Sequence, residues 1–334
     1  MHVLIRGAGV AGLAVAYELV QRGAAVTVAD TASSLGAGAS WCAGGMLAPY
    51  CERESAEEDV ITLGKGAASW WDRVLPGIVN FKGTLVVAPP RNAFELKHFV
   101  ARTTGYAAVS AEEIAALEPD LDGRFQAGLF FAEEAHLDPR AALEKLQVKL
   151  ASKGVQFAFG PANETDHTCF DRVVDCTGMA AKTALPQLRG IRGEMLYLET
   201  PEITLSRPVR LIHPRFPVYI VPRGNGRFMV GATMIESDDE GPPSARSLVE
   251  LLNAAYALHP AFAEARILEL SSGVRPAFPD NLPRIVERGV TAYVNGLYRH
   301  GFLLAPALAR QAAEVLYSNE EASFNEADRQ RRTA

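Results

Sequence analysis

The amino-terminal stretch MHVLIRGAGVAGLAVAYELVQRGAAVTVAD combines short apolar runs with a helical pattern. His2 to Arg6 reads as a short buried strand, and Ala25 to Ala29 reads as a second strand that ends at Asp30. Between them, apolar side chains recur at helical spacing over residues 10–22, namely Ala11, Ala14, Val15, Leu19 and Val20. The pattern therefore predicts strand, helix and strand, the order typical of an α/β fold.

Glycines separate the first predicted strand from the predicted helix in the spacing Gly7-x-Gly9-x-x-Gly12. Gly7 permits a tight turn, Gly9 lets the backbone approach a pyrophosphate, and Gly12 lets the helix lie close to the sheet. The free N–H groups at the helix start favour phosphate, and Asp30 is placed to bind a ribose hydroxyl. These features predict a site for FAD or NAD. The alternative is a glycine-rich turn in an unrelated α/β fold.

The second half of the chain alternates apolar and polar positions, which is typical of strands with one buried face. GEMLYLE, PVRLIHP, VYIVPRG and GRFMVGATM read as strands of an antiparallel sheet, and SARSLVELLNAAYALHP reads as a covering helix. Gly224-Asn225-Gly226 is a reverse-turn signal between two of these strands. ESDDEGPP reads as an exposed loop before the helix.

Composition narrows the class of protein. Hydrophobic residues make up 48 % and charged residues 22 % of 334 residues, as in an ordinary globular protein. A net charge of −6 gives no support to nucleic-acid binding. Four cysteines without metal-like spacing predict neither a metal site nor disulfides. No stretch is apolar enough for a membrane span, and Arg6 interrupts the only run that resembles an export signal, so we expect a cytoplasmic enzyme or binding protein.

Four further segments carry a family resemblance. They are TASSLGAGASWCAGGMLAP, LDPRAALEKLQVKLASKGVQFAFG, DRVVDCTGMAAK and GLYRHGFLLAPALARQAAEVL. In this order they resemble the FAD-dependent amine oxidases of the D-amino-acid oxidase group, and within it the glycine oxidases, including those of the thiamine pathway. The resemblance covers essentially the whole chain and selects FAD over NAD. Asp30 replaces the commoner Glu of the family.

The resemblance implies a non-covalent FAD site, with the reduced flavin stabilised by backbone N–H groups at the start of a carboxy-terminal helix. Cys176 could suggest a covalent flavin link, but a buried, inert thiol is the better interpretation. The expected cofactor residues are Gly7, Gly9, Val10, Ala11, Gly12, Asp30, Thr31, Ala39, Ser40, Gly44, Gly45, Met46, Ala162, Thr177, Gly178, Arg299, His300, Gly301, Phe302 and Leu303.

The resemblance also implies the substrate residues. Arg275 matches the arginine that binds the substrate carboxylate as a bidentate fork, and Arg299 matches a second arginine near substrate and flavin. Tyr219 and Met234 match residues that line the pocket, although both could be core packing. In the segment YCERESAEEDVITLGKGAASWWDRVL, which has a helical pattern, Glu52 and Glu54 could face the pocket, but a solvated helix start is the safer interpretation; Trp70 and Trp71 read as core.

The family fold implies two interleaved domains. We expect a Rossmann-like FAD domain from residues 1–77, 135–190 and 270–334, and an antiparallel-sheet substrate domain from residues 78–134 and 191–269. The fold class is α/β in the FAD domain and α+β overall.

The implied reaction is oxidative deamination of glycine or another small amino acid. A hydride passes from Cα to flavin N5, and the imino acid is hydrolysed; dioxygen then gives hydrogen peroxide, or a protein or quinone acceptor takes the electrons. One alternative is a D-amino-acid or secondary-amine dehydrogenase of the sarcosine or proline type. Another is a non-catalytic flavoprotein subunit. A homo-oligomer is left open.

Overall fold

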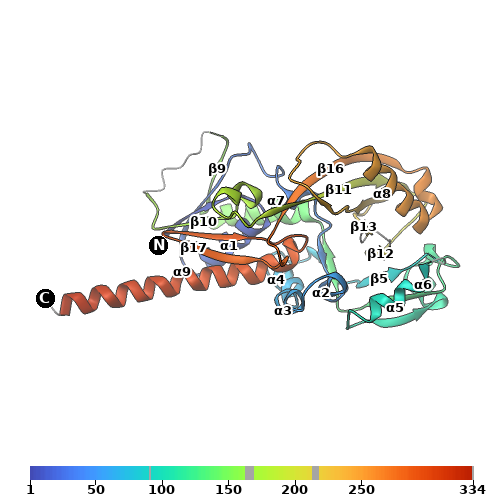
Figure 1. The fold of residues 1–334 in the computed structure, drawn as a ribbon, viewed down its shortest axis with the longest axis horizontal. Coiled ribbons are helices and arrows are strands. Elements are labelled where there is room, and N and C mark those ends of the chain that lie inside the picture. The colour runs from blue at the N-terminus through green and yellow to red at the C-terminus, as the bar shows by residue number, and fades with distance from the viewer. Residues whose placement is uncertain (90–91, 162–168, 213–217, 333–334) are drawn as a thin grey trace.

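The structure is a computed structural model that describes residues 1–89, 92–161, 169–212 and 218–332. Two large sheets organise the chain (Figure 1). The parallel and antiparallel sheets confirm the expected mixed α/β class. No helix in these ranges is both long enough and apolar enough to cross a bilayer.

The first sheet has the strand order β17-β18-β10-β1-β2-β9. Its strands run parallel except β17, which is antiparallel to β18. The bounds are β1 His2–Arg6, β2 Ala25–Asp30, β9 Gln156–Phe159, β10 Arg172–Asp175, β17 Arg284–Arg288 and β18 Thr291–Asn295. Helix α1 packs against both α7 and α9, and their apolar side chains form one core with β1 and β2. These helices are α1 Val10–Gln21, α7 Pro139–Ser152 and α9 Gly301–Arg332.

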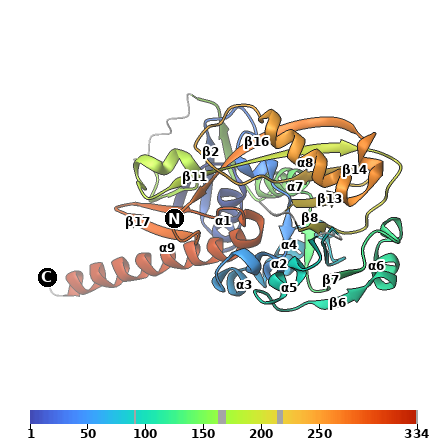
Figure 2. The same ribbon diagram turned by 45° about the vertical axis from the view of Figure 1, so that its right-hand side comes forward.

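The second sheet is mostly antiparallel and has the order β15-β11-β14-β13-β12-β5-β7-β6, with β16 paired to β11. The bounds are β5 Thr84–Val87, β6 Ala107–Ser110, β7 Ala127–Phe131, β11 Arg189–Glu199, β12 Val209–Leu211, β13 Val218–Pro222, β14 Arg227–Gly231, β15 Ile235–Glu236 and β16 Arg266–Ala277. Figure 2 shows α8 (Ala245–Leu258) lying over this sheet. Helices α5 (Glu95–Val100) and α6 (Ala111–Leu117) lie near β6 and β7 (Figure 2).

Side chains of the second sheet alternate between two cores, as the pleat of a strand requires. Leu196, Ile220 and Val230 belong to the core that includes α8. Met195, Tyr219 and Met229 belong to a different core on the opposite face. Tyr219, which is expected to line a substrate pocket, therefore lies on the face turned away from α8, whereas Met234 packs against the core that includes α8.

A third, small sheet joins β3 (Met46–Leu47), β8 (Ala135–Leu137) and β4 (Val79–Asn80). The segment after β3 was expected to have a continuous helical pattern, but it is broken into α2 (Pro49–Glu52), α3 (Asp59–Gly64) and α4 (Ala67–Val74). Short 3-10 turns cover Ala39–Cys42, Arg53–Ser55, Pro119–Leu121, Gly178–Thr183 and Pro260–Ala263.

The tryptophans of α4 are core residues, as expected. Trp70 and Trp71 are almost fully buried, and the indole N–H of Trp71 donates to the Phe302 carbonyl at 2.9 Å. Pro306 lies in the second turn of α9, where it has no N–H to offer this carbonyl. Trp71 therefore satisfies a carbonyl that the helix itself leaves free.

Candidate active site

A cavity of about 1450 Å³ opens between the two large sheets. It exceeds the roughly 300–1,000 Å³ of an ordinary small-molecule pocket, so it has room for a dinucleotide and a small second ligand. Two groups of residues line it. One belongs to the turns and helix starts of the first sheet, and the other to the inner face of the second sheet.

The turn between β1 and α1 forms the first part of the cavity wall. Gly7 has a φ of +97°, and an added Cβ would lie 2.6 Å from the Cys176 carbonyl oxygen. Gly9 and Val10 line the cavity, whereas Gly12 does not: an added Cβ there would lie 1.9 Å from the Gly7 oxygen. Gly12 therefore sets the close packing of α1 on the turn, and Gly7 and Gly9 keep the space in front of the helix start clear.

Asp30, at the end of β2, holds this turn in shape. One carboxylate oxygen accepts from the Ala8 N–H at 2.7 Å, and the other accepts from the Ala32 N–H at 2.9 Å. Asp30 and Thr31 both line the cavity, where a ribose would lie at the end of the second strand.

The small-residue loop after β2 lies against the same cavity. Ser40 Oγ accepts from the Val10 N–H at 3.1 Å, which ties the loop to the start of α1. The expected residues that line the cavity here are Ala11, Ala39, Ser40, Gly44, Gly45, Met46, Thr177 and Gly178. Ala162 lies outside the described residues. Burial raises the pKa of the neighbouring Cys176 thiol, which agrees with an inert cysteine.

The start of α9 completes the cofactor part of the cavity. Gly301, Phe302 and Leu303 line it, and Val10 of α1 lies 3.3 Å from the position of a Cβ on Gly301. Two helix amino termini therefore converge on the cavity, and the first N–H groups of a helix have no intrahelical acceptor. Such termini favour negative charge, so these residues fit the pyrophosphate and the pyrimidine edge of FAD.

A cluster of charged side chains marks the other end of the cavity. The Tyr219 hydroxyl, on β13, donates to Glu52 Oε1 at 2.6 Å and accepts from Arg210 Nη1 at 3.1 Å. Glu52 Oε2 also forms an ion pair with Arg299 Nη2 at 2.7 Å. Tyr219, Glu52 and Arg299 all line the cavity, so α2, β13 and the loop before α9 meet there.

Glu52 corrects an expectation. The sequence favoured a solvated helix start, but this side chain is 5 % exposed. Burial alone would raise the pKa of Glu52, yet the charges of Arg299, of His300 at the low pH where Glu52 titrates, and of Arg210, together with the Tyr219 hydrogen bond, lower it to about 2. Glu52 is therefore an ionised carboxylate inside the site. Glu54 is mostly buried and pairs with Arg210 at 2.8 Å, and it is not among the cavity-lining residues.

His300 lies beside this ion pair without adding charge to it. Its Nδ1 is 3.5 Å from Glu52 Oε2, and its ring is almost fully buried. Burial lowers the pKa of His300 to about 4; Glu52 opposes this shift, and Arg299 and Arg275 add to it. The ring is consequently neutral at pH 7.

Arg275, on β16, differs from Arg299 in its partners. Its Nη1 donates to the Thr233 carbonyl at 3.2 Å, and no carboxylate among the described residues forms an ion pair with it. Burial lowers the pKa of Arg275 to about 10, and nearby Arg299 acts in the same direction. The guanidinium still carries its charge at neutral pH, so the cavity contains a cation that forms no ion pair with any carboxylate of the described part of the chain.

Met234 contacts one of the two arginines, Arg299. Its sulfur is 3.4 Å from the Tyr298 hydroxyl and 3.6 Å from Arg299 Nη1. The structure therefore brings Arg275, Tyr219, Arg299 and Met234 to one cavity. Their roles toward a substrate stay predictions.

Comparisons with known proteins agree with this arrangement. The family described as FAD dependent oxidoreductase matches residues 2–315. The putative thiamine biosynthesis oxidoreductase ThiO of Rhizobium etli is 60 % identical over 96 % of this chain and 98 % of its own length. The bifunctional protein ThiO/ThiG of a Nostoc species is 30 % identical over 94 % of this chain and 52 % of its own length.

A solved structure shows the same fold. The crystal structure of glycine oxidase from Geobacillus kaustophilus has a TM-score of 0.78 at 23 % identity and covers 95 % of this chain and 94 % of its own. The glycine-rich turn, the two helix starts and the match along nearly the whole chain together identify this protein as a member of the FAD-dependent oxidoreductase family that includes D-amino-acid oxidase.

Proposed function

We propose that this enzyme oxidises glycine, or another small α-amino acid, to the imino acid, and that Arg275 binds the substrate carboxylate. The observation that carries the proposal is the contrast between the two arginines in the cavity. Glu52 neutralises Arg299 at 2.7 Å, whereas Arg275 has no ion pair with a carboxylate among the described residues. A half-buried guanidinium of this kind is matched by a planar carboxylate, which it can bind through two parallel hydrogen bonds.

The charges of the cavity also bear on the substrate amine. Arg275 and Arg299 contribute two positive charges, ionised Glu52 one negative charge, and neutral His300 none. This part of the cavity therefore has an excess positive charge, which favours an amino acid with an ionised carboxylate and a neutral amine. A neutral amine is the form that can release a hydride from Cα, so no separate general base is required.

Bound FAD supplies the electron sink for this reaction. The chain supplies orientation, because Arg275 fixes one end of the substrate, and the start of α9, directly after Arg299 and His300, would favour negative charge on the bound cofactor. We assign dioxygen as the acceptor, with hydrogen peroxide as the second product. We place the reaction in thiamine biosynthesis because the Rhizobium relative carries that name at 60 % identity.

Anaerobic reduction of the bound flavin tests the proposal. We would mix the purified holoenzyme with glycine, sarcosine, D-alanine and D-proline in turn, follow bleaching of the visible flavin band, and then admit air and measure peroxide. Glycinamide is the matched control because it keeps the amine and lacks the carboxylate. We expect bleaching by glycine, none by glycinamide, and peroxide on reoxidation.

Three results would count against parts of this proposal. Equal bleaching by glycine and glycinamide would remove the carboxylate from recognition. Bleaching by sarcosine or D-proline without glycine would move the substrate to secondary amines. Bleaching without peroxide would replace dioxygen by a protein or quinone acceptor.

A further inference from the structure

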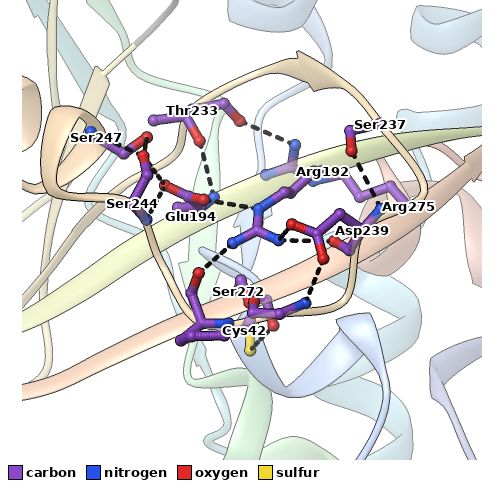
Figure 3. Close-up of polar contacts among 12 residues, drawn as sticks. Cys42, Arg192, Glu194, Thr233, Ser237, Asp239, Ser244, Ser247, Ser272 and Arg275 are labelled. Carbon is purple, nitrogen blue, oxygen red and sulfur yellow. Dashed lines mark hydrogen bonds and ion pairs between the residues drawn. The ribbon is translucent and has the colours of Figure 1, made fainter.

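We propose that Gly193 and Thr233 are positioning residues that hold the Arg275 guanidinium ready for a carboxylate. The inference rests on the proposed function of Arg275 and adds two residues that the sequence did not single out. Figure 3 shows the polar contacts that connect Arg275 and Thr233 to strand β11. One residue provides space and the other provides a hydrogen bond.

Gly193 provides the space. It lies on β11 opposite Gly273 of β16, two positions along the register from the pair of Ile191 and Arg275. Side chains two positions apart on neighbouring strands share a face of the sheet. A Cβ added to Gly193 would lie 2.0 Å from Arg275 Nη2 and 2.3 Å from Cζ. The guanidinium therefore lies directly on the backbone of β11, in the space that any other side chain would fill.

Thr233 provides the hydrogen bond through its carbonyl oxygen, which accepts from Arg275 Nη1 at 3.2 Å. Thr233 is itself held at two points by Glu194. Its Oγ1 accepts from the Glu194 N–H at 2.9 Å, and its own N–H donates to the Glu194 carbonyl at 3.1 Å. With both bonds in place, the carbonyl of this buried residue points toward Arg275 (Figure 3).

The opposite face of β11 is equally fixed. Arg192 Nε donates to the Glu194 carboxylate at 2.6 Å, and its other nitrogens donate to Asp239 at 2.7 Å and to the Pro242 carbonyl at 2.6 Å. Glu194 Oε2 accepts from the Ser244 N–H at 3.2 Å. These contacts anchor β11 to the loop before α8, so the strand under Arg275 cannot shift without breaking the hydrogen bonds of Arg192 to Asp239 and Pro242 and of Glu194 to Ser244.

Fixing Arg275 in advance lowers the cost of binding, because a long flexible side chain otherwise loses rotamer freedom when it grips a ligand. Such a role affects recognition of the carboxylate more than retention of FAD. This difference allows a positioning role to be distinguished from a general structural one.

The test uses acetate, a carboxylate without an amine, as the probe. We would titrate it into the holoenzyme and follow the shift of the flavin spectrum for wild type, Thr233→Val, Thr233→Ser, Gly193→Ala and the reference Arg275→Gln. FAD content and Tm would be measured for each. Glycine kinetics would separate KM from kcat.

We expect Thr233→Val to raise the Kd for acetate about fivefold, the order expected for one lost hydrogen bond, and Thr233→Ser to restore it. Gly193→Ala should weaken acetate nearly as much as Arg275→Gln, since the methyl group displaces the guanidinium. In Thr233→Val and in Gly193→Ala, KM for glycine should rise by a larger factor than kcat falls, and FAD should be retained.

The outcomes separate the two proposals. Unchanged acetate affinity in Arg275→Gln would overturn the proposed function of Arg275. Weakened affinity in Arg275→Gln, with wild-type affinity in Thr233→Val or Gly193→Ala, would overturn the positioning role of that residue alone. Equal weakening in Thr233→Val and Thr233→Ser would show that the Oγ1 hydrogen bond is not what matters.

Discussion

The two ends of the cavity are built by different means. At the cofactor end, the walls are backbone: the turn at Gly7 and Gly9, the small-residue loop, and the starts of α1 and α9. At the substrate end, the walls are charged side chains, with Arg275, Arg299 and Glu52 close together. The first end recognises its ligand by leaving room and offering N–H groups. The second recognises its ligand by an imbalance of charge.

The difference predicts different failures. A change at the cofactor end should act through volume and remove the cofactor altogether. A change to one of the charged residues at the substrate end should act through charge, altering stability or substrate affinity while the cofactor stays bound.

The largest expected effect is that of Gly9→Val. The added side chain would enter the space in front of the helix start, next to Ser40 Oγ, which lies 3.2 Å from the position of a Cβ. We expect nearly complete loss of FAD, measured as the visible absorbance of the purified protein. Gly66→Ala, before α4 and outside the cavity, is the control and should stay yellow. A yellow Gly9→Val protein would contradict the prediction that FAD needs the space in front of Gly9.

The next effect is that of Glu52→Gln on stability. It leaves Arg299 buried without its counter-charge, and losing one partner of a buried pair costs about 3–5 kcal/mol. Urea unfolding of the two holoenzymes measures the difference. Glu199→Gln breaks the more exposed pair with Arg227 and should cost less than about 1 kcal/mol. Equal costs for the two variants would mean that Glu52 is not the buried counter-charge.

Arg275→Gln should act on substrate affinity instead. Leaving the substrate carboxylate without its cation should weaken glycine binding by about 2–5 kcal/mol, measured as a rise in KM. FAD content should stay at the wild-type level, because Arg275 lies at the substrate end. Arg227→Gln, an exposed arginine on β14, should change neither quantity. Unchanged kinetics in Arg275→Gln would assign the carboxylate to another residue.

The smallest effect concerns a second buried carboxylate, Glu134. Burial raises the pKa of Glu134 to about 8, whereas Glu52 is held at about 2. Between the unfolded value near 4.5 and 8, the folded protein holds a proton that the unfolded chain releases, so stability falls as pH rises. From pH 6 to pH 8, Glu134 should lower the free energy of unfolding by about 2 kcal/mol.

Urea unfolding across this pH range measures the effect. Glu134→Gln keeps an oxygen that accepts from the Cys51 N–H, and it should remove the part of the stability loss between pH 6 and pH 8 that Glu134 causes. Glu133→Gln, its exposed neighbour, should retain it. A fall of equal size in wild type and Glu134→Gln would mean that Glu134 is ionised throughout.

The same contrast explains how much could be read from the sequence. The cofactor end was predictable because its determinants are local: Gly7, Gly9 and Asp30 lie within one strand–helix–strand unit, and their spacing is fixed by the turn they make. The antiparallel strands were predictable from alternation for the same reason. The segment after β3 was not, because the partition into α2, α3 and α4 depends on packing rather than on apolar spacing.

Glu52 was considered as a pocket residue, but its burial and its ion pair were not predicted because its partners are distant in sequence. Tyr219 comes from β13 and Arg299 from the loop before α9. The residues that neighbour Glu52 in the sequence do not indicate either contact. Gly193 and Thr233 escaped notice similarly, since a glycine within a strand has meaning only when the side chain lying on it is known. The position of Glu52, shortly after the small-residue loop that follows β2, is the local feature of the sequence that indicates a side chain facing the pocket.

The convergence of α1 and α9 has a consequence for biosynthesis. Val10 and Gly301 are neighbours in space but come from opposite ends of the described chain, and Trp71 holds α9 through the Phe302 carbonyl. A nascent chain that still lacks residues 301–303 therefore has the helix start of α1 but not that of α9 at the cofactor end of the cavity, whatever else has folded. Flavin uptake should therefore follow the synthesis of α9, and ribosome-bound fragments that end before α9 should emerge colourless.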